Sequence, residues 1–149
     1  MTETPLVIGS DHAGLSLKST LVAFLEQRGV AVDDRGTHTL DSCDYPVVAA
    51  EVCQQIRTTQ AIGVLICGTG LGMSMAANRY TGIRAAVCTN EYLARMARLH
   101  NNANVLCLGD RVLGVELAQS ILEAFLQSTF EGGRHQRRVD LIDTGSPQS

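Results

Sequence analysis

Cys67 is the residue whose type and position in this sequence best suit catalysis. It follows the strongest strand pattern, Ile62-Gly63-Val64-Leu65-Ile66, and opens the loop Cys67-Gly68-Thr69-Gly70-Leu71-Gly72, after which a helix is expected. Glycines let backbone N–H groups turn inward at a helix start, where they form a nest for an anion. A thiol beside such a nest is favoured as the thiolate, the form that acts as a base or nucleophile. We therefore expect Cys67 to be functional.

The other cysteines are expected to be small buried hydrophobic residues: Cys43, Cys53, Cys88 and Cys107. Five is an odd number and no C-x-x-C pair occurs, so we expect free thiols in a reducing compartment. The start of the chain lacks a secretory pattern, and no apolar run approaches the ~20 residues of a membrane helix. These features predict a cytoplasmic protein that does not enter a membrane.

Polar residues also follow two other apolar segments. Asp11-His12 comes after Leu6-Val7-Ile8, and Arg111 comes shortly after Val105-Leu106-Cys107-Leu108. Parallel strands present their carboxyl ends at one edge of a sheet, where ligands of open α/β folds bind. We therefore expect the loops after these two strands and the Cys67 loop to form one pocket.

The histidines leave more than one interpretation open. His12 and His100-Asn101 have equal claims as functional and as merely exposed groups, whereas His38 is expected at the surface. Asp11, His12 and His100 could supply metal ligands, but neither H-x-x-x-H nor H-E-x-x-H spacing is present. We expect no metal and no cofactor.

A local basic cluster stands out in an acidic protein. The net charge is −3, from 12 basic and 15 acidic residues, which does not favour nucleic acid or an anionic membrane as a partner. Arg134 and Arg138 lie four residues apart, on one face of an expected helix, with Arg137 beside them. A charge run is usually a solvated face, but arginine grips phosphate through two hydrogen bonds, so this cluster is a candidate phosphate site.

Short apolar segments alternate with amphipathic helical patterns along the chain. Strands are expected at about 6–8, 30–32, 62–66, 83–87 and 105–108, and helices at about 17–28, 45–56, 71–78, 92–100 and 115–126, with a short last helix from about 133 and a frayed end at 144–149. This alternation predicts an α/β fold with a parallel sheet covered on both faces. A length of 149 residues suits one domain, 1–149, with an ordered core of about 5–143.

The glycine loop resembles a dinucleotide-binding fingerprint only in part. Its spacing is G-x-G-x-G instead of G-x-G-x-x-G, and the strand before it is the third one. No acidic residue ends the next strand, and the Lys-Ser/Thr pair of a phosphate-binding P-loop is missing. Only the anion nest remains from this comparison.

Several motifs together resemble the type B ribose-5-phosphate isomerases, a group that also contains galactose-6-phosphate and allose-6-phosphate isomerases. They are Gly9-Ser10-Asp11-His12-Ala13-Gly14, Asp44-Tyr45-Pro46, Cys67 to Ser74, Ala76-Ala77-Asn78, Gly82-Ile83-Arg84-Ala85, His100-Asn101 and Glu131-Gly132-Gly133-Arg134-His135. The resemblance extends from about Leu6 to Val139. It implies a three-layer, Rossmann-like sandwich with five parallel strands, and a homodimer with shared active sites. It also implies conversion of ribose 5-phosphate to ribulose 5-phosphate through an enediolate, a reaction of the pentose phosphate pathway.

The resemblance also implies roles for individual residues. Cys67 would be the base, assisted by Thr69, and His100 would open the sugar ring with help from Asp11. Backbone N–H groups would form the oxyanion hole, those of Gly68, Gly70, Leu71, Gly72 and Met73. Sugar hydroxyls and phosphate would be bound by His12, Asn101, Arg111, Arg134 and Arg138. Some relatives use a glutamate later in the loop, but Met73 occupies that position here and cannot take a proton.

Two alternatives and one geometric expectation complete the interpretation. The chain could act on allose or galactose 6-phosphate, or it could be a non-catalytic sugar-phosphate-binding module, although pure binding does not need the reactive thiol of Cys67. His100 precedes a strand, so we expect it at the edge opposite Cys67 and predict that it serves a second subunit. Whether dimers pair into tetramers is left open.

Overall fold

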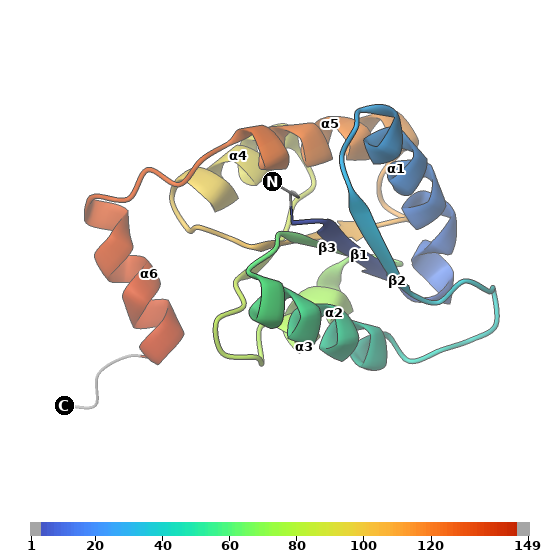
Figure 1. Ribbon diagram of the computed structural model, residues 1–149, viewed down its shortest axis with the longest axis horizontal. Coiled ribbons are helices and arrows are strands. Elements are labelled where there is room, and N and C mark those ends of the chain that lie inside the picture. Colours follow the sequence, from blue (N-terminus) through green and yellow to red (C-terminus); the bar gives the residue numbers. More distant parts are fainter. Residues whose placement is uncertain (1–3, 146–149) are drawn as a thin grey trace.

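The protein is an α/β fold in which a five-stranded parallel sheet carries helices on both faces, as the computed structural model of residues 4–145 shows (Figure 1). The strand order is β2-β1-β3-β5-β4, and each neighbouring pair is parallel. The strands are β1 (Leu6–Ser10), β2 (Val32–Gly36), β3 (Gly63–Cys67), β4 (Ala85–Val87) and β5 (Val105–Gly109). The helices are η1 (His12–Gly14, a 3-10 turn), α1 (Leu15–Gln27), α2 (Tyr45–Thr59), α3 (Leu71–Ala77), α4 (Glu91–Leu99), α5 (Val115–Gln127) and α6 (Arg134–Thr144). The predicted fold class is confirmed.

Two hydrophobic cores lie on the two faces of the sheet, because successive side chains of a strand point to opposite faces. On one face, Ile8, Ile66 and Leu108 pack in the core formed with α1, α4 and α5. On the other face, Leu65 and Cys67 belong to the core formed with α2 and α3. Figure 1 shows the same three layers, with α1, α4 and α5 above the sheet and α2 and α3 below it. The side chain of Cys67 therefore points toward the α2–α3 layer.

The neighbouring strands β1 and β3 mark the place where the helices change faces. The helix after β1 is α1, on one face, and the helix after β3 is α3, on the other. The loops that leave these strands turn toward opposite faces, and ligands of open α/β folds bind at such a place on the carboxyl edge of the sheet. The Asp11 N–H donates to the Ile66 carbonyl at 3.2 Å and ties the two loop starts together.

The second strand differs from the prediction. Sequence reasoning placed it at 30–32, whereas β2 spans Val32–Gly36 and is mostly polar. As an edge strand, β2 pairs only with β1, so much of it faces water and needs no apolar pattern. Ion pairs hold its charged residues: the buried Lys18 ammonium lies 2.7 Å from Asp34, and the Arg35 guanidinium lies 3.0 Å from Asp33. The hydrophobic pattern therefore missed this strand.

The other observed element boundaries agree more closely with the predicted ones. β4 is shorter than predicted, since it begins at Ala85. α6 runs to Thr144, and the rest of the predicted frayed end, 146–149, lies outside the described residues.

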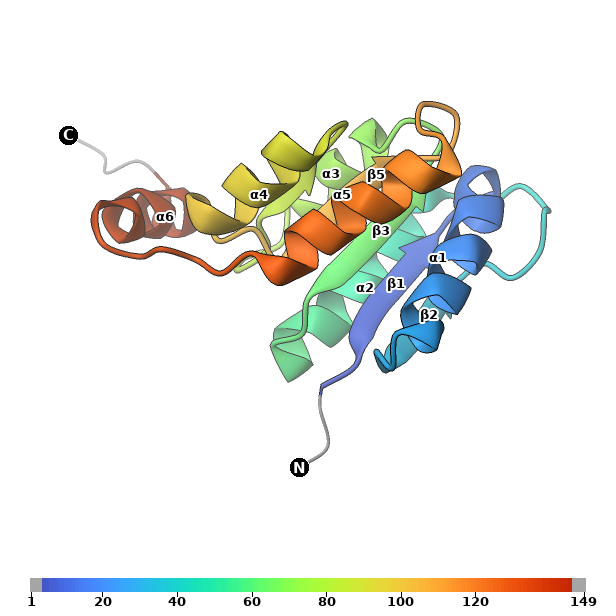
Figure 2. The same cartoon turned by 90° about the horizontal axis from the view of Figure 1, so that it is seen from above.

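Figure 2 shows α6 standing at one end of the molecule, away from the sheet. An ion pair between Arg84 and Asp143, at 3.0 Å, connects it to the start of β4.

Candidate active site

The Cys67 loop places a backbone donor against the sulfur and further backbone N–H groups beyond it. The Cys67 side chain is buried, and its Sγ accepts a hydrogen bond from the Gly70 N–H at 3.2 Å. Gly70 reaches this position with a left-handed backbone, φ 85°, which favours glycine. The first turn of α3 then presents the N–H groups of Gly72 and Met73, for which a helix has no internal acceptors. The loop can thus stabilise negative charge on the sulfur or on an oxygen bound beside it.

The loop after β5 supports the Cys67 loop from the neighbouring strand. The Asp110 and Arg111 N–H groups donate to the carbonyls of Cys67 and Gly68 at 2.9 and 3.0 Å. Gly109 lies so close that a Cβ there would stand 2.7 Å from the Thr69 backbone. A Cβ on Gly68 would stand 3.3 Å from the Arg111 guanidinium, which therefore lies over the loop. Arg111 brings a positive charge to the same edge as Cys67.

Asp11 and His12 reach this edge from the end of β1. The Asp11 carboxylate is nearly buried, and Oδ1 accepts from the Gly14 N–H at 3.1 Å. His12 Nδ1 accepts from the Cys43 N–H at 3.1 Å, so in neutral imidazole the proton sits on Nε2. The predicted convergence of these residues with Cys67 and Arg111 at one sheet edge follows from the parallel sheet.

The remaining cysteines have different surroundings. Burial raises the pKa of Cys53 to about 11, against the opposing charge of Arg57, and raises the pKa of Cys88 to about 11. Burial also raises the pKa of Cys107 well above its usual value. These three thiols are core residues that stay protonated at neutral pH, as expected. The expectation of burial is wrong for Cys43. It lies in the loop before α2, where it packs in neither hydrophobic core and is only half-buried.

A second group of predicted site residues lies at the opposite edge. His100 follows α4 and precedes β5, while Cys67 pairs with Gly109 at the far end of that strand. The length of β5 alone separates the two edges by about 13 Å. The other residues on the His100 side are Asn101, Arg134 and Arg138, and all three are exposed. One chain therefore does not bring the two groups together.

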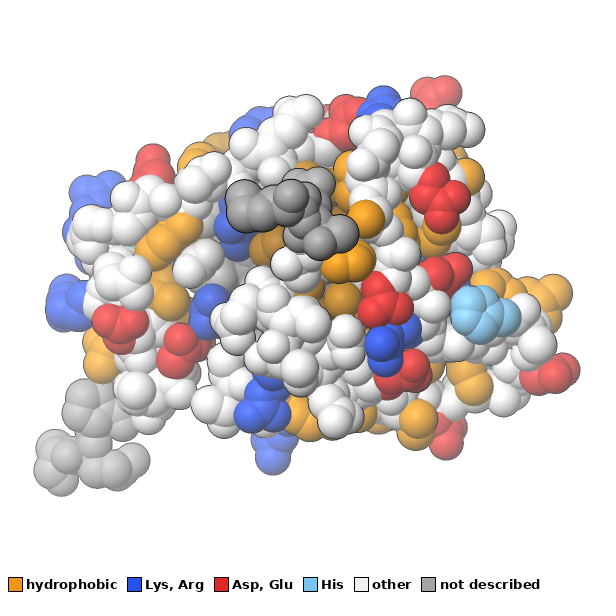
Figure 3. All heavy atoms as spheres, in the orientation of Figure 1, with side chains coloured by type: hydrophobic (Ala, Val, Ile, Leu, Met, Phe, Trp, Pro, Cys, Tyr) orange, Lys and Arg blue, Asp and Glu red, His pale blue; other side chains and the backbone are white. Residues whose placement is uncertain are grey.

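Basic side chains gather on α6. Arg134, Arg137 and Arg138 are all exposed on this helix. Figure 3 shows basic side chains over α6 at the left of the molecule, with acidic ones between them. A cavity of about 500 Å³ lies between α6 and β4, with Asn101 and Ile142 in its wall. Its carboxylate, Asp143, is already paired with Arg84, so the cavity offers no free base.

Sequence reasoning did not select Tyr45, Asp110, Glu131 and His135 as site residues, although three of them lie in the motifs that carry the family resemblance. The Tyr45 ring covers Gly72, where a Cβ would stand 2.6 Å from it, and Asp110 Oδ2 accepts from the Leu17 N–H at 3.0 Å. Near His100, the side chains of Glu131 and His135 come within 4.8 Å of its ring nitrogen. The signals in the sequence were these motifs and the i, i+4 spacing of Glu131 and His135. Their approach to His100 depends on the tertiary fold.

Comparisons with known proteins agree on one family. The family model described as Ribose/Galactose Isomerase matches residues 6–142. The chain is 48% identical over 138 residues to ribose-5-phosphate isomerase B of Escherichia coli, covering 92% of this chain and 93% of that protein. It is 42% identical to D-erythrulose-4-phosphate isomerase of Pectobacterium atrosepticum, covering 92% and 91%. The structure of ribose-5-phosphate isomerase B from Clostridium thermocellum superposes with a TM-score of 0.93 at 49% identity, covering 95% and 96% of the two chains.

Proposed function

The chain belongs to the ribose/galactose isomerase family and is a sugar-phosphate isomerase, and we propose that it interconverts ribose 5-phosphate and ribulose 5-phosphate with Cys67 as the base and without a metal. The observation that carries this proposal is the Cys67 Sγ, which accepts the Gly70 N–H at 3.2 Å inside a loop of backbone donors. A base beside such donors suits a reaction whose intermediate is an oxyanion.

The proposed reaction moves one proton between neighbouring carbons. The Cys67 thiolate takes the proton from C2 of the open-chain aldose and returns it to C1, while a hydroxyl proton shifts from O2 to O1. The negative charge of the enediolate falls on oxygen, where N–H groups of residues 68–73 would hold it, and Thr69 would assist. Preorganised donors of this kind contribute roughly 3–4 kcal/mol each to the transition state.

The other steps need the residues of the opposite edge. Ring opening is assigned to His100, with Asp11 as its helper. Hydroxyl and phosphate binding is assigned to His12, Asn101, Arg111, Arg134 and Arg138. Since Asp11 and His100 lie at opposite edges of one chain, we propose a homodimer in which each site takes His100 and α6 from the second subunit. Large exposed apolar side chains on α3 and α4, including Leu71, Met75 and Tyr92, are consistent with a partner.

The test is a kinetic comparison of pure enzyme on a panel of phosphorylated sugars. We expect kcat/KM to be highest for ribose 5-phosphate, ahead of allose 6-phosphate and galactose 6-phosphate. The panel should include erythrulose 4-phosphate, because the Pectobacterium relative carries that name. A higher kcat/KM on a four- or six-carbon substrate would reassign the substrate. Turnover of none of them would favour the non-catalytic alternative.

The proposal also includes the compartment and the pathway in which the protein works. The five free thiols fit a reducing compartment, and we propose the cytoplasm and the pentose phosphate pathway as the setting. Within residues 4–145, no helix is both long and apolar enough to cross a bilayer.

The metal-free part of the proposal is tested with a chelator. Because the proposed base is a thiol, EDTA should not lower the rate of turnover. A loss of activity that a divalent ion restores would contradict the metal-free mechanism.

A further inference from the structure

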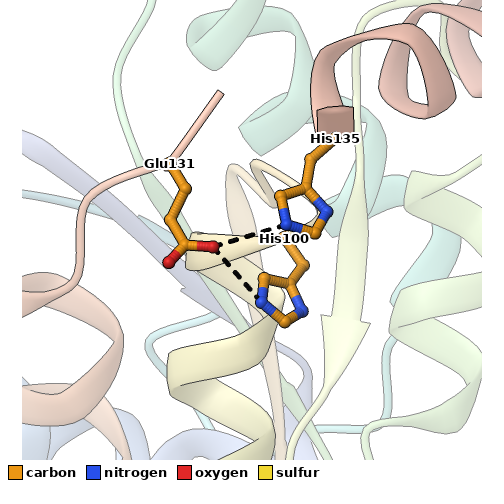
Figure 4. Close-up of side chains that lie close together, drawn as sticks. All are labelled: His100, Glu131 and His135. Atoms are coloured by element: carbon orange, nitrogen blue, oxygen red, sulfur yellow. Dashed lines mark ion pairs between the residues drawn. The ribbon is translucent and has the colours of Figure 1, made fainter. Parts of the chain in front are cut away.

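Three potential metal ligands converge where α4 ends and α6 begins. His100, Glu131 and His135, here called the His–Glu–His cluster, come from two segments that are about thirty residues apart in the sequence. Figure 4 shows both imidazole rings turning one nitrogen toward the same carboxylate oxygen. Cys67 lies at the opposite edge of the sheet, so these side chains form a separate cluster.

The distances in the cluster suit coordination better than hydrogen bonding. Glu131 Oε1 lies 3.4 Å from His100 Nε2 and 3.4 Å from His135 Nε2. Hydrogen bonds between nitrogen and oxygen are usually about 2.7–3.2 Å long, so both contacts are long for that role. Ligands bound tetrahedrally to zinc at about 2.1 Å stand about 3.4 Å from one another. The two nitrogen–oxygen separations therefore already equal two edges of a zinc site.

The cluster is held in place and remains open on one side. The Glu131 N–H donates to the Leu99 carbonyl at 3.0 Å, which fixes the loop against the end of α4. The His135 side chain is 10% exposed, whereas those of His100 and Glu131 are 40% and 51% exposed. The rings stack with their centroids 4.2 Å apart, so a shared ion requires them to tilt toward each other. The exposure of His100 leaves room for that tilt and for a fourth ligand from solvent.

We propose that the His–Glu–His cluster is a zinc-binding site whose occupation inhibits the enzyme. Two imidazole nitrogens and one carboxylate oxygen form a borderline donor set that suits Zn²⁺ and does not match the all-oxygen preference of Mg²⁺ and Ca²⁺. The ion would take the Nε2 of His100. The inhibition of the enzyme by Zn²⁺ rests on the proposed role of His100 in ring opening. The binding of Zn²⁺ to the cluster does not depend on that role. The metal is thus an inhibitor of a reaction that needs none.

Binding is tested separately from activity. In the Cys67→Ala protein, which removes the reactive thiol, calorimetry should show one Zn²⁺ per chain with micromolar affinity. Glu131→Gln and His135→Asn should each weaken binding at least about tenfold, since even outer-shell partners of a metal are worth 10–100-fold. His38→Asn, a change at a histidine of another loop, is the matched control and should bind as tightly as its parent.

A spectroscopic readout identifies the donors. Co²⁺ in place of Zn²⁺ should give the visible bands of a four- or five-coordinate site without a thiolate charge-transfer band. No saturable binding at micromolar zinc, equal binding by Glu131→Gln, or a thiolate band would each overturn the proposal. Circular dichroism of Glu131→Gln should match its parent, because Glu131 is exposed and lies in a loop.

Inhibition then separates the two proposals. In protein with Cys67 intact, Zn²⁺ should reduce ribose 5-phosphate turnover with half-inhibition at the measured dissociation constant, and EDTA should restore the rate. The half-inhibiting concentration should rise in Glu131→Gln by the same factor as the dissociation constant. Binding to the cluster without inhibition would keep the zinc site and contradict the assignment of His100 to ring opening.

Discussion

Individual side chains divide the cysteines of this protein into two chemical classes. Cys67 Sγ accepts a hydrogen bond from the Gly70 N–H, whereas burial in an apolar core raises the pKa of Cys53 and Cys88 to about 11. A buried thiol without donors loses solvation when it ionises, so it stays neutral. All three side chains are almost inaccessible to solvent, so the backbone donor at the Cys67 sulfur, and not exposure, distinguishes this cysteine.

The first prediction at this scale concerns the base. Cys67→Ala should reduce turnover by about 10² or more while the fold and phosphate binding persist, because a positioned base contributes roughly 10²–10⁴. Steady-state kinetics with ribose 5-phosphate measure the effect, and Cys53→Ala is the control that should retain turnover. Near-normal activity of Cys67→Ala would remove Cys67 from the mechanism.

The second prediction concerns phosphate. Arg134→Ala and Arg138→Ala should mainly raise KM, because the proposed role of the guanidinium groups is to bind the phosphate, a part of the substrate that does not react. Free ribose should be a poor substrate of the wild-type enzyme for the same reason. The KM of each variant and the ratio of kcat/KM for ribose 5-phosphate and ribose measure the effect. Equal activity on the two sugars would refute this assignment.

At the scale of elements, the Cys67 loop depends on the strand beside it. Gly109 ends β5 against the backbone of Thr69, and the residues after it donate hydrogen bonds to Cys67 and Gly68. Backbone packed against backbone cannot yield by a change of rotamer. The position of the Gly68–Gly72 donors is therefore determined jointly by β3 and β5.

The third prediction follows from that contact. In Gly109→Ala, the new Cβ would stand 2.7 Å from the Thr69 backbone, so the Cys67 loop must shift. A displacement of this size should lower kcat by about 10²-fold, since a misplacement of ~1 Å near reacting groups has that effect. Gly114→Ala is the control, because a Cβ there meets no atom within 4 Å. Unchanged kcat in Gly109→Ala would show that the donors tolerate movement of this loop.

At the scale of the whole molecule, one chain holds two incomplete halves of the proposed site. Cys67, Asp11 and Arg111 lie at the carboxyl edge of the sheet, while His100 lies at the other edge. Figure 2 shows α6 at one end of the molecule. A two-fold axis that places the His100 edge of one chain against the Cys67 edge of another would complete two sites at once. In the proposed dimer, the projecting α6 would reach the second subunit.

The fourth prediction tests this arrangement by complementation. Mixing inactive Cys67→Ala with inactive His100→Ala should restore up to about a quarter of the wild-type activity, because half of the randomly exchanged dimers are mixed and each has one intact site of two. The activity of the mixture is compared with each variant alone, after mass spectrometry has verified exchange. Verified exchange without recovered turnover would count against a shared site.

Local patterns in the sequence were sufficient to predict most elements and the Cys67 edge. Val48, Val52 and Ile56 recur with helical spacing, and all three are buried in α2. Continuous apolar strands imply parallel pairing, and parallel pairing alone brings the ends of β1, β3 and β5 to one edge. The order of residues along the chain is therefore enough to group Asp11, Cys67 and Arg111.

Tertiary structure decided what local patterns do not encode. The polar β2 is a strand because its partner β1 and ion pairs such as Lys18–Asp34 hold it, and neither leaves a hydrophobic period in the sequence. The contact between Gly109 and Thr69, and the meeting of His100 with Glu131 and His135, join segments that are distant along the chain. Such contacts depend on how the helices pack on the sheet, and that packing is a property of the complete fold.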